Sequence, residues 1–227
     1  METRKRSVNQ IIEEQIRKWE YQKAERARKK IPAASLVTIS REAGSQGTLV
    51  AEKLAERLGY DLFHQEVVHE MAEDIKVSVR FVETLDERGL NTLENLIASL
   101  VDERYLWPDQ YMKHLMKVIG TIGMHGKSVI VGRGANFILQ QDKRISVRIY
   151  APFDVRARNV AERSGIPLEE AKRQIINTES ERRSFVRKYF NASISDLDNY
   201  DLALNTGTLG IEKTVDAITA VCPPAGG

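Results

Sequence analysis

The sequence predicts a parallel α/β sheet of about five strands with helices on both faces. Short apolar runs alternate with longer stretches whose apolar residues recur at helical spacing. These runs begin near residues 36, 60, 128, 145 and 201. The first of them also leads through a tight glycine-containing loop into a helix, a connection common in parallel sheets.

Length and composition set limits on the class of protein. The chain has 227 residues, enough for one large or two small domains with a buried core. Lys and Arg number 34 and Asp and Glu 32, so net charge does not indicate a nucleic-acid partner. Cys222, in a tail that looks flexible, is the one cysteine, which argues against a disulfide framework. We find no membrane-length apolar run and no signal peptide, and we expect a cytoplasmic protein.

Residues 1–31 are predicted to form an amphipathic helical extension. Ser7 and Gln10 have the spacing of a capping box. An apolar stripe follows, formed by Val8, Ile11, Ile12, Ile16 and Trp19. This stripe must be buried against the domain itself or against a second copy, which would give a homodimer. The basic segment 26–30 could contact nucleic acid, but interspersed glutamates favour a solvated face.

Residues 36–58 predict a strand, a tight loop and a helix. The loop contains Gly44, Ser45 and Gly47, whose backbone can turn sharply and point N–H groups inward. Because a helix N-terminus favours anions, a phosphate would fit there. The alternative is an ordinary strand-to-helix turn.

The phosphate-loop motif G-x-x-x-x-G-K-[ST] is only partly present. With Thr48 as the hydroxyl residue, we assign Gln46 to the lysine position, with Gly47 between the two. The segment therefore lacks the expected lysine, and Arg41 in the same loop is a candidate substitute.

The next strand, at 60–63, leads into His64 and Glu66. His64 is either a proton carrier or a surface hydrogen-bonding group, and Glu66 begins a helix over 65–74. Residues 76–126 are predicted to be mainly helical.

A strand over 128–131 leads into Gly132, Arg133 and Gly134. This arrangement delivers a guanidinium to the carboxyl edge of a parallel sheet, where ligands bind. Arg133 is our first candidate for contact with an acceptor, the alternative being a surface arginine in a turn.

After a strand over 145–150, two arginine-rich helices over 151–163 and 168–189 are joined by a short turn. Their guanidinium groups could surround a migrating phosphoryl group, although charged helices are often only solvated. The candidates are Arg156, Arg182, Arg183 and Arg187. A final strand at 200–204, a loop at 205–207 and a helix over 211–221 close the chain.

Four segments resemble the cytidylate kinase-like proteins, relatives of the nucleoside monophosphate kinases with a degenerate phosphate loop. They are TISREAGSQGTLVAEKLAERLGYDLFHQEVV, VIVGRGANFIL, ESERRSFVRKYF and DNYDLALNTGTLGIEKTVDAI, in this order. The resemblance implies a P-loop kinase-like domain over 32–221, with a helical acceptor-side insertion at 76–126 and an arginine-rich lid at 152–190. Residues 222–227 would form a flexible tail.

The resemblance also implies ATP-dependent phosphoryl transfer to a nucleoside monophosphate such as CMP or dCMP. ATP and Mg²⁺ would be held by the loop, with Thr48 as the metal ligand, and the acceptor by Arg133, Glu66 and His64. The loop candidates are Arg41, Gly44, Ser45, Gln46, Gly47 and Thr48. The family usually has Asp-Arg-Glu where this chain has His64-Gln65-Glu66. Two alternatives stay open: a nucleotide-binding regulatory or interaction module without useful catalysis, and a nucleic-acid-binding protein.

Overall fold

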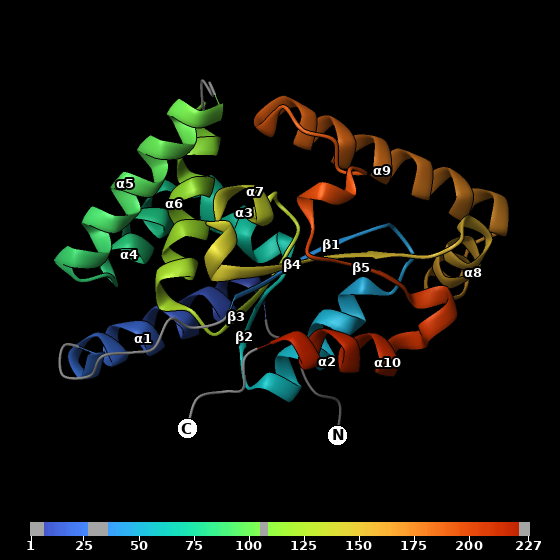
Figure 1. Cartoon of the computed structure of the whole chain (residues 1–227), viewed down its shortest axis with the longest axis horizontal. Coiled ribbons are helices and arrows are strands. Elements are labelled where there is room, and N and C mark those ends of the chain that lie inside the picture. The colour runs from blue at the N-terminus through green and yellow to red at the C-terminus, as the bar shows by residue number, and fades with distance from the viewer. Residues whose placement is uncertain (1–6, 27–35, 105–108, 223–227) are drawn as a thin grey trace. The chain divides into compact units, whose positions relative to one another are not determined.

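The computed structural model in Figure 1 describes residues 7–26, 36–104 and 109–222. The chain divides into two compact units. The first comprises residues 1–34 and 63–126, and the second comprises residues 35–62 and 127–227. The helix predicted as a separate N-terminal extension therefore belongs to the same unit as the predicted insertion.

The sheet has five parallel strands in the order β2-β3-β1-β4-β5. Their bounds are β1 Leu36–Arg41, β2 Asp61–Phe63, β3 Ser128–Val131, β4 Arg144–Tyr150 and β5 Leu202–Asn205. In the register of the central pair, Leu36 lies opposite Arg144 and Ser40 opposite Arg148. The predicted fold class is confirmed.

The core of the second unit lies on this sheet. Val37, Ile39, Val147 and Ile149 are at most 1% exposed, as expected for strands covered on both faces. The helices of this unit are α2 Gly47–Leu58, α7 Ala135–Ile138, α8 Phe153–Ser164, α9 Leu168–Phe190 and α10 Thr206–Val221. Helices α2 and α10 lie side by side against the sheet (Figure 1).

The segment that follows β5 differs from the prediction. The expected loop at 205–207 is a helical turn, because the Asn205 side chain accepts a hydrogen bond from the Gly207 N–H at 3.0 Å. Gly210 then interrupts the helix with φ 72° and ψ 176°, so the helix resumes at Ile211, the predicted start.

A second difference from the prediction lies at the end of α10. Cys222 was placed in a flexible tail, yet it is 8% exposed and packs in the core of the second unit. This burial raises the pKa of its thiol. Residues 223–227 lie outside the described part of the chain.

The first unit contains five helices in its described residues. They are α1 Val8–Arg26, α3 Gln65–Glu73, α4 Ile75–Glu83, α5 Glu87–Arg104 and α6 Gln110–His125. The predicted capping box is confirmed, since the Ser7 N–H donates to Gln10 Oε1 at 2.9 Å and the Gln10 N–H to Ser7 Oγ at 3.2 Å.

The apolar stripe of α1 is buried within its own unit. Trp19 is 1% exposed, stacks on the His125 ring at a centroid distance of 3.7 Å and lies 4.8 Å from the Phe81 ring. The unit itself is thus the partner that the stripe required, and no second copy is needed to cover it. Residues 27–30 of the basic segment lie outside the described residues. None of the described helices has the length and hydropathy of a membrane span.

Candidate functional site

The loop between β1 and α2 adopts a tight turn. Gly44 has φ 80° and Gln46 has φ 59°, both in the left-handed region. Ser45 between them is fully buried, and its Oγ donates to the Glu42 carbonyl oxygen at 2.9 Å. The loop therefore has one defined conformation that ends at the N-terminus of α2.

The backbone amides of this loop are available to a ligand. Those of Gly44, Gln46, Gly47 and Thr48 donate no hydrogen bond to any residue in the described part of the chain. The first amides of a helix have no acceptor within the helix, and the helix dipole favours an anion beside them. The loop therefore offers a set of unused backbone donors beside a helix N-terminus, as anion binding requires.

The register of the motif needs a correction. Counting back from Thr48 with the spacing of G-x-x-x-x-G-K-[ST] places Gly47 in the lysine position, Gln46 at the second glycine and Arg41 at the first. The left-handed backbone of Gln46 agrees with a glycine position. Gly47 also approaches Arg41 so closely that a Cβ there would lie 2.6 Å from Arg41 Cβ. Assigning Gln46 to the lysine position was therefore wrong.

Three consecutive loop carbonyls, those of residues 43–45, are held by side chains from α8 and α10. Arg156 Nη1 donates to the first at 3.1 Å, Asn159 Nδ2 to the second at 2.8 Å and Thr206 Oγ1 to the third at 2.7 Å. Because these three carbonyl oxygens already accept hydrogen bonds, the backbone groups that the loop can offer to a ligand are its amides.

Arg156, a predicted catalytic residue, is engaged on all sides by protein acceptors. It is 6% exposed, and its Nε donates to the Ala151 carbonyl oxygen at 2.9 Å and lies 3.1 Å from Glu42 Oε2. Its Nη1 also donates to Glu179 Oε1 at 2.5 Å. These contacts connect the start of α8, the loop and α9. Arg156 therefore positions the loop.

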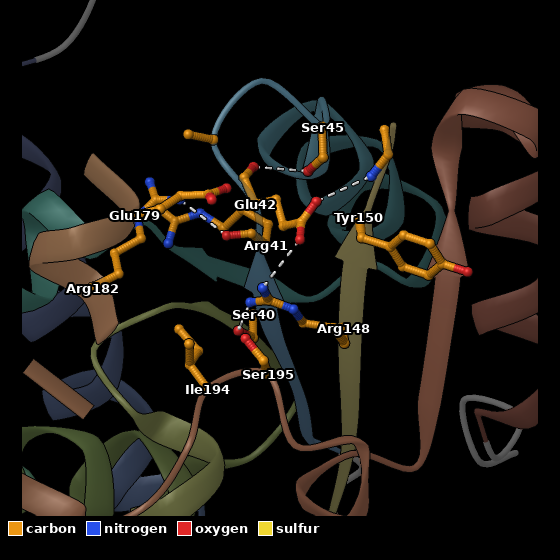
Figure 2. Close-up of polar contacts among 12 residues, drawn as sticks. Ser40, Arg41, Glu42, Ser45, Arg148, Tyr150, Glu179, Arg182, Ile194 and Ser195 are labelled. Atoms are coloured by element: carbon orange, nitrogen blue, oxygen red, sulfur yellow. Dashed lines mark hydrogen bonds and ion pairs between the residues drawn. The ribbon is translucent and has the colours of Figure 1, made fainter. Parts of the chain in front are cut away.

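A small cavity beside the loop gathers several charged side chains. We call it the cationic hollow, and Figure 2 shows most of its walls. It is lined by Arg41, Glu42, Arg148, Glu179, Arg182, Arg183, Ile194 and Ser195. Four guanidinium groups face two carboxylates, so the lining has an excess of two positive charges. That excess matches the charge of a phosphate dianion.

The predicted arginines of α9 differ in their placement. Arg182 Nη1 donates to the Arg41 carbonyl oxygen at 2.9 Å, which connects α9 directly with the loop. Arg183 is exposed and lies 3.8 Å from Glu179 Oε2. Arg187 lies outside the cationic hollow and lines a neighbouring one together with Arg183 and residues 191–194. The hollow therefore includes Arg182 and Arg183 but neither Arg156 nor Arg187.

Glu42 and Arg148 are among the residues of the hollow that the sequence reasoning missed. Glu42 Oε1 lies 3.6 Å from Arg148 Nη2 while its other oxygen pairs with Arg156. Arg148 is 7% exposed on the central strand β4. A charged residue within a strand buried on both faces is itself a signal, since burying a charge requires a partner.

Arg133 lies in the second unit at the end of β3. It has φ 52° between two glycines that also have positive φ, and its Nε is buried without a hydrogen-bond partner in the described residues. The guanidinium carbon lies 5.6 Å from the centroid of the Phe185 ring of α9. Arg133 is thus half-buried against α9 rather than extended on the open surface.

The two other predicted acceptor residues belong to the first unit. His64 immediately precedes α3, and Glu66 lies exposed in its first turn, where the helix dipole favours a carboxylate. Their contact with an acceptor stays a prediction.

Thr48 is suited to the metal role predicted for it. The residue is half-buried in the first turn of α2, and its hydroxyl makes no hydrogen bond to another described residue. Among those residues, no cluster of three or more His, Cys, Asp or Glu could hold a metal. Mg²⁺ typically takes one or two protein ligands together with phosphate oxygens and water, so a single hydroxyl beside a phosphate site fits it.

Tyr200 makes the free energy of unfolding depend on pH. Burial raises the pKa of its phenol above the ordinary 10.0, although contact with Ser40 opposes the shift. The folded protein favours the neutral phenol, because the pKa of Tyr200 is higher in the folded state than in the unfolded state. The contribution of this phenol to the free energy of unfolding is therefore complete below pH 10.0 and is lost as the pH rises through the folded-state pKa. Urea denaturation should show a steeper fall in the free energy of unfolding above this pH for the wild type than for Tyr200→Phe. Equal slopes would contradict this account.

The sequence and the fold of this chain are similar to those of known proteins. Residues 36–208 match the cytidylate kinase-like family. A cytidylate kinase of Natronomonas pharaonis is 31% identical over 193 residues, which cover 83% of this chain and 91% of that protein. One from Ignicoccus hospitalis is 28% identical over 185 residues, 81% of this chain and 96% of that protein.

A solved structure supports the fold. The crystal structure of an uncharacterized protein from Eubacterium ventriosum has a TM-score of 0.57 and 24% identity, covering 82% of this chain and 96% of that one. The family match extends from β1, through the loop and the arginines of α9, to the start of α10. The chain is a member of the cytidylate kinase-like family.

Proposed function

We propose that this protein transfers a phosphoryl group from ATP to a pyrimidine nucleoside monophosphate, CMP or dCMP. The observation that carries the proposal is the contact between α9 and the end of β1, where Arg182 donates to the Arg41 carbonyl beside a hollow of net positive charge. Phosphoryl transfer depends on positioning and on cations around the migrating group, and this site offers both.

Each part of the site has a role in this proposal. The loop amides of Gly44, Gln46, Gly47 and Thr48 bind the phosphates of the donor, and the hydroxyl of Thr48 holds Mg²⁺ with the phosphate oxygens. When bound, the metal neutralises charge on those oxygens. Arg182 and Arg183 stabilise the transferring group, and Arg156 keeps the loop in position.

The acceptor is assigned to Arg133, while contact of Glu66 and His64 with an acceptor stays a separate prediction. Arg133 supports this role because its buried Nε lacks a partner in the described residues. We retain residues 152–190 as the lid and residues 76–126 as the acceptor-side insertion. A cytoplasmic location is part of the proposal.

Arg41 is proposed to replace the phosphate-loop lysine. No lysine occurs between residues 36 and 52, and loss of a cation near the β and γ phosphates would cost about 3 kcal/mol of transition-state stabilisation. Arg41 is 8% exposed, lines the cationic hollow and packs against Gly47. We expect kcat of Arg41→Ala to fall about 100-fold in a coupled ADP-release assay. Unchanged turnover would eliminate Arg41 as the substitute.

The proposed activity is tested by measuring ADP release with CMP, dCMP, UMP, AMP and GMP as acceptors. Nucleotide binding is measured in parallel by calorimetry on the same preparation. Turnover that is fastest with CMP or dCMP is the expected result. Nucleotide binding with no turnover on any acceptor would overturn the proposal and indicate a nucleotide-binding regulatory module instead.

A further inference from the structure

Arg148 is a buried cation on a rigid strand at the cationic hollow. It lies on β4 directly opposite Ser40 of β1, and its side chain is 9% exposed. Figure 2 shows it in the hollow with Arg182 of α9, and Arg183 of the same helix lines the hollow as well. Unlike those two, Arg148 is carried by the centre of the sheet.

The donors of Arg148 are only partly used. Its Nη1 donates to Ser40 Oγ at 2.8 Å and the guanidinium also contacts the Tyr200 hydroxyl, but its Nη2 lies 3.6 Å from Glu42 Oε1, beyond hydrogen-bond distance. Arg156 differs, because its Nε and Nη1 donate to carbonyl and carboxylate oxygens at 3.1 Å or less. Arg148 therefore keeps donor capacity for a ligand in the hollow.

Two neighbours hold this guanidinium in place. Its central carbon lies 6.0 Å from the centroid of the Tyr200 ring. The Tyr200 hydroxyl lies 3.2 Å from Ser40 Oγ and donates to the Ile194 carbonyl oxygen at 2.9 Å. A guanidinium supported in this way is already in position before a ligand binds, which reduces the conformational entropy lost on binding.

We propose that Arg148 is a further phosphate-binding residue of this site. Its Nη2 binds an oxygen of the phosphoryl group in the cationic hollow, exchanging the long contact with Glu42 for a charge-assisted hydrogen bond. Arg182 and Arg183 approach the same group from α9. The identity of the ligand as a phosphoryl group rests on the proposed function.

The test uses the full chain and inorganic pyrophosphate as the probe. Arg148→Gln and Arg148→Lys are compared with Arg144→Gln, a matched control on the same strand. The Arg144 side chain is also 9% exposed, but its Nη1 pairs with Asp201 at 3.5 Å and it does not line the hollow. Calorimetry should show about a tenfold weaker pyrophosphate affinity for Arg148→Gln, a smaller loss for Arg148→Lys and a change under about twofold for Arg144→Gln.

A second measurement uses the wild-type protein, so that the test gives a result even if Arg148→Gln folds poorly. The Nε–Hε NMR signal of Arg148, assigned by its loss in Arg148→Lys, should shift when pyrophosphate is added to the wild-type protein. An unmoved signal, or equal affinities for wild type and Arg148→Gln, would overturn the inference even if the protein is an active kinase. If no acceptor is phosphorylated but the affinity still depends on Arg148, the inference stands and the proposed function fails.

Discussion

Replacing Arg182 by alanine is expected to lower kcat about 10³-fold, because an arginine that stabilises a migrating phosphoryl group contributes at least this much in related chemistry. Its guanidinium lines the cationic hollow and donates to the Arg41 carbonyl oxygen at 2.9 Å. The variant loses both a positive charge near the transferring group and the link between α9 and the loop. Steady-state kinetics with CMP and ATP measure the effect.

Arg173→Ala is the matched control for this prediction. Arg173 lies on the same helix, but it is exposed and lines neither hollow. We expect its kcat to stay within about twofold of wild type, as for an exposed residue outside the site. Similar rates for the two variants would show that Arg182 does not contact the transferring group.

Glu42→Ala is expected to lower the free energy of unfolding by about 3 kcal/mol, since removing one partner from a buried ion pair leaves an uncompensated charge. Glu42 contacts two arginines whose side chains are only 8% and 9% exposed. Its Oε2 also accepts from the Ala151 N–H at 3.4 Å. The variant leaves Arg148 without a carboxylate partner and Arg156 with Glu179 alone, and urea denaturation measures the cost.

A surface ion pair of α2 and α10 provides the comparison. Glu212 is 60% exposed and pairs with Lys53 and Arg57. Its replacement by alanine should cost less than about 1 kcal/mol, because solvent screens such pairs. If Glu42→Ala costs no more than Glu212→Ala, the buried charge network does not stabilise the fold as described.

Local patterns were sufficient to predict most of the elements. The strands are apolar runs bounded by polar or glycine residues, and the helix α2 follows from its spacing of apolar residues, so the sheet could be predicted directly. The capping box at Ser7 and Gln10 depends only on neighbours in sequence. The turn at 205–207 was missed because Asn205 caps a helix there instead of ending a loop.

The site was less predictable because its contacts join distant parts of the chain. Ser40 and Arg148 are 108 residues apart, and Arg182 reaches a carbonyl 141 residues away. Spacing reveals neither pairing, and it could not separate Arg182, which lines the hollow, from Arg156, which positions the loop. The register of Gln46 follows from counting along the motif, and its left-handed backbone agrees with that register.

The central claim is that the loop amides after β1 receive a phosphate. Backbone ¹⁵N–¹H NMR during titration with a non-hydrolysable ATP analogue and Mg²⁺ tests this most directly. We predict that the amide signals of Gln46, Gly47 and Thr48 move together, with a single affinity. Signals of these three amides that stay fixed while the analogue binds would contradict the account.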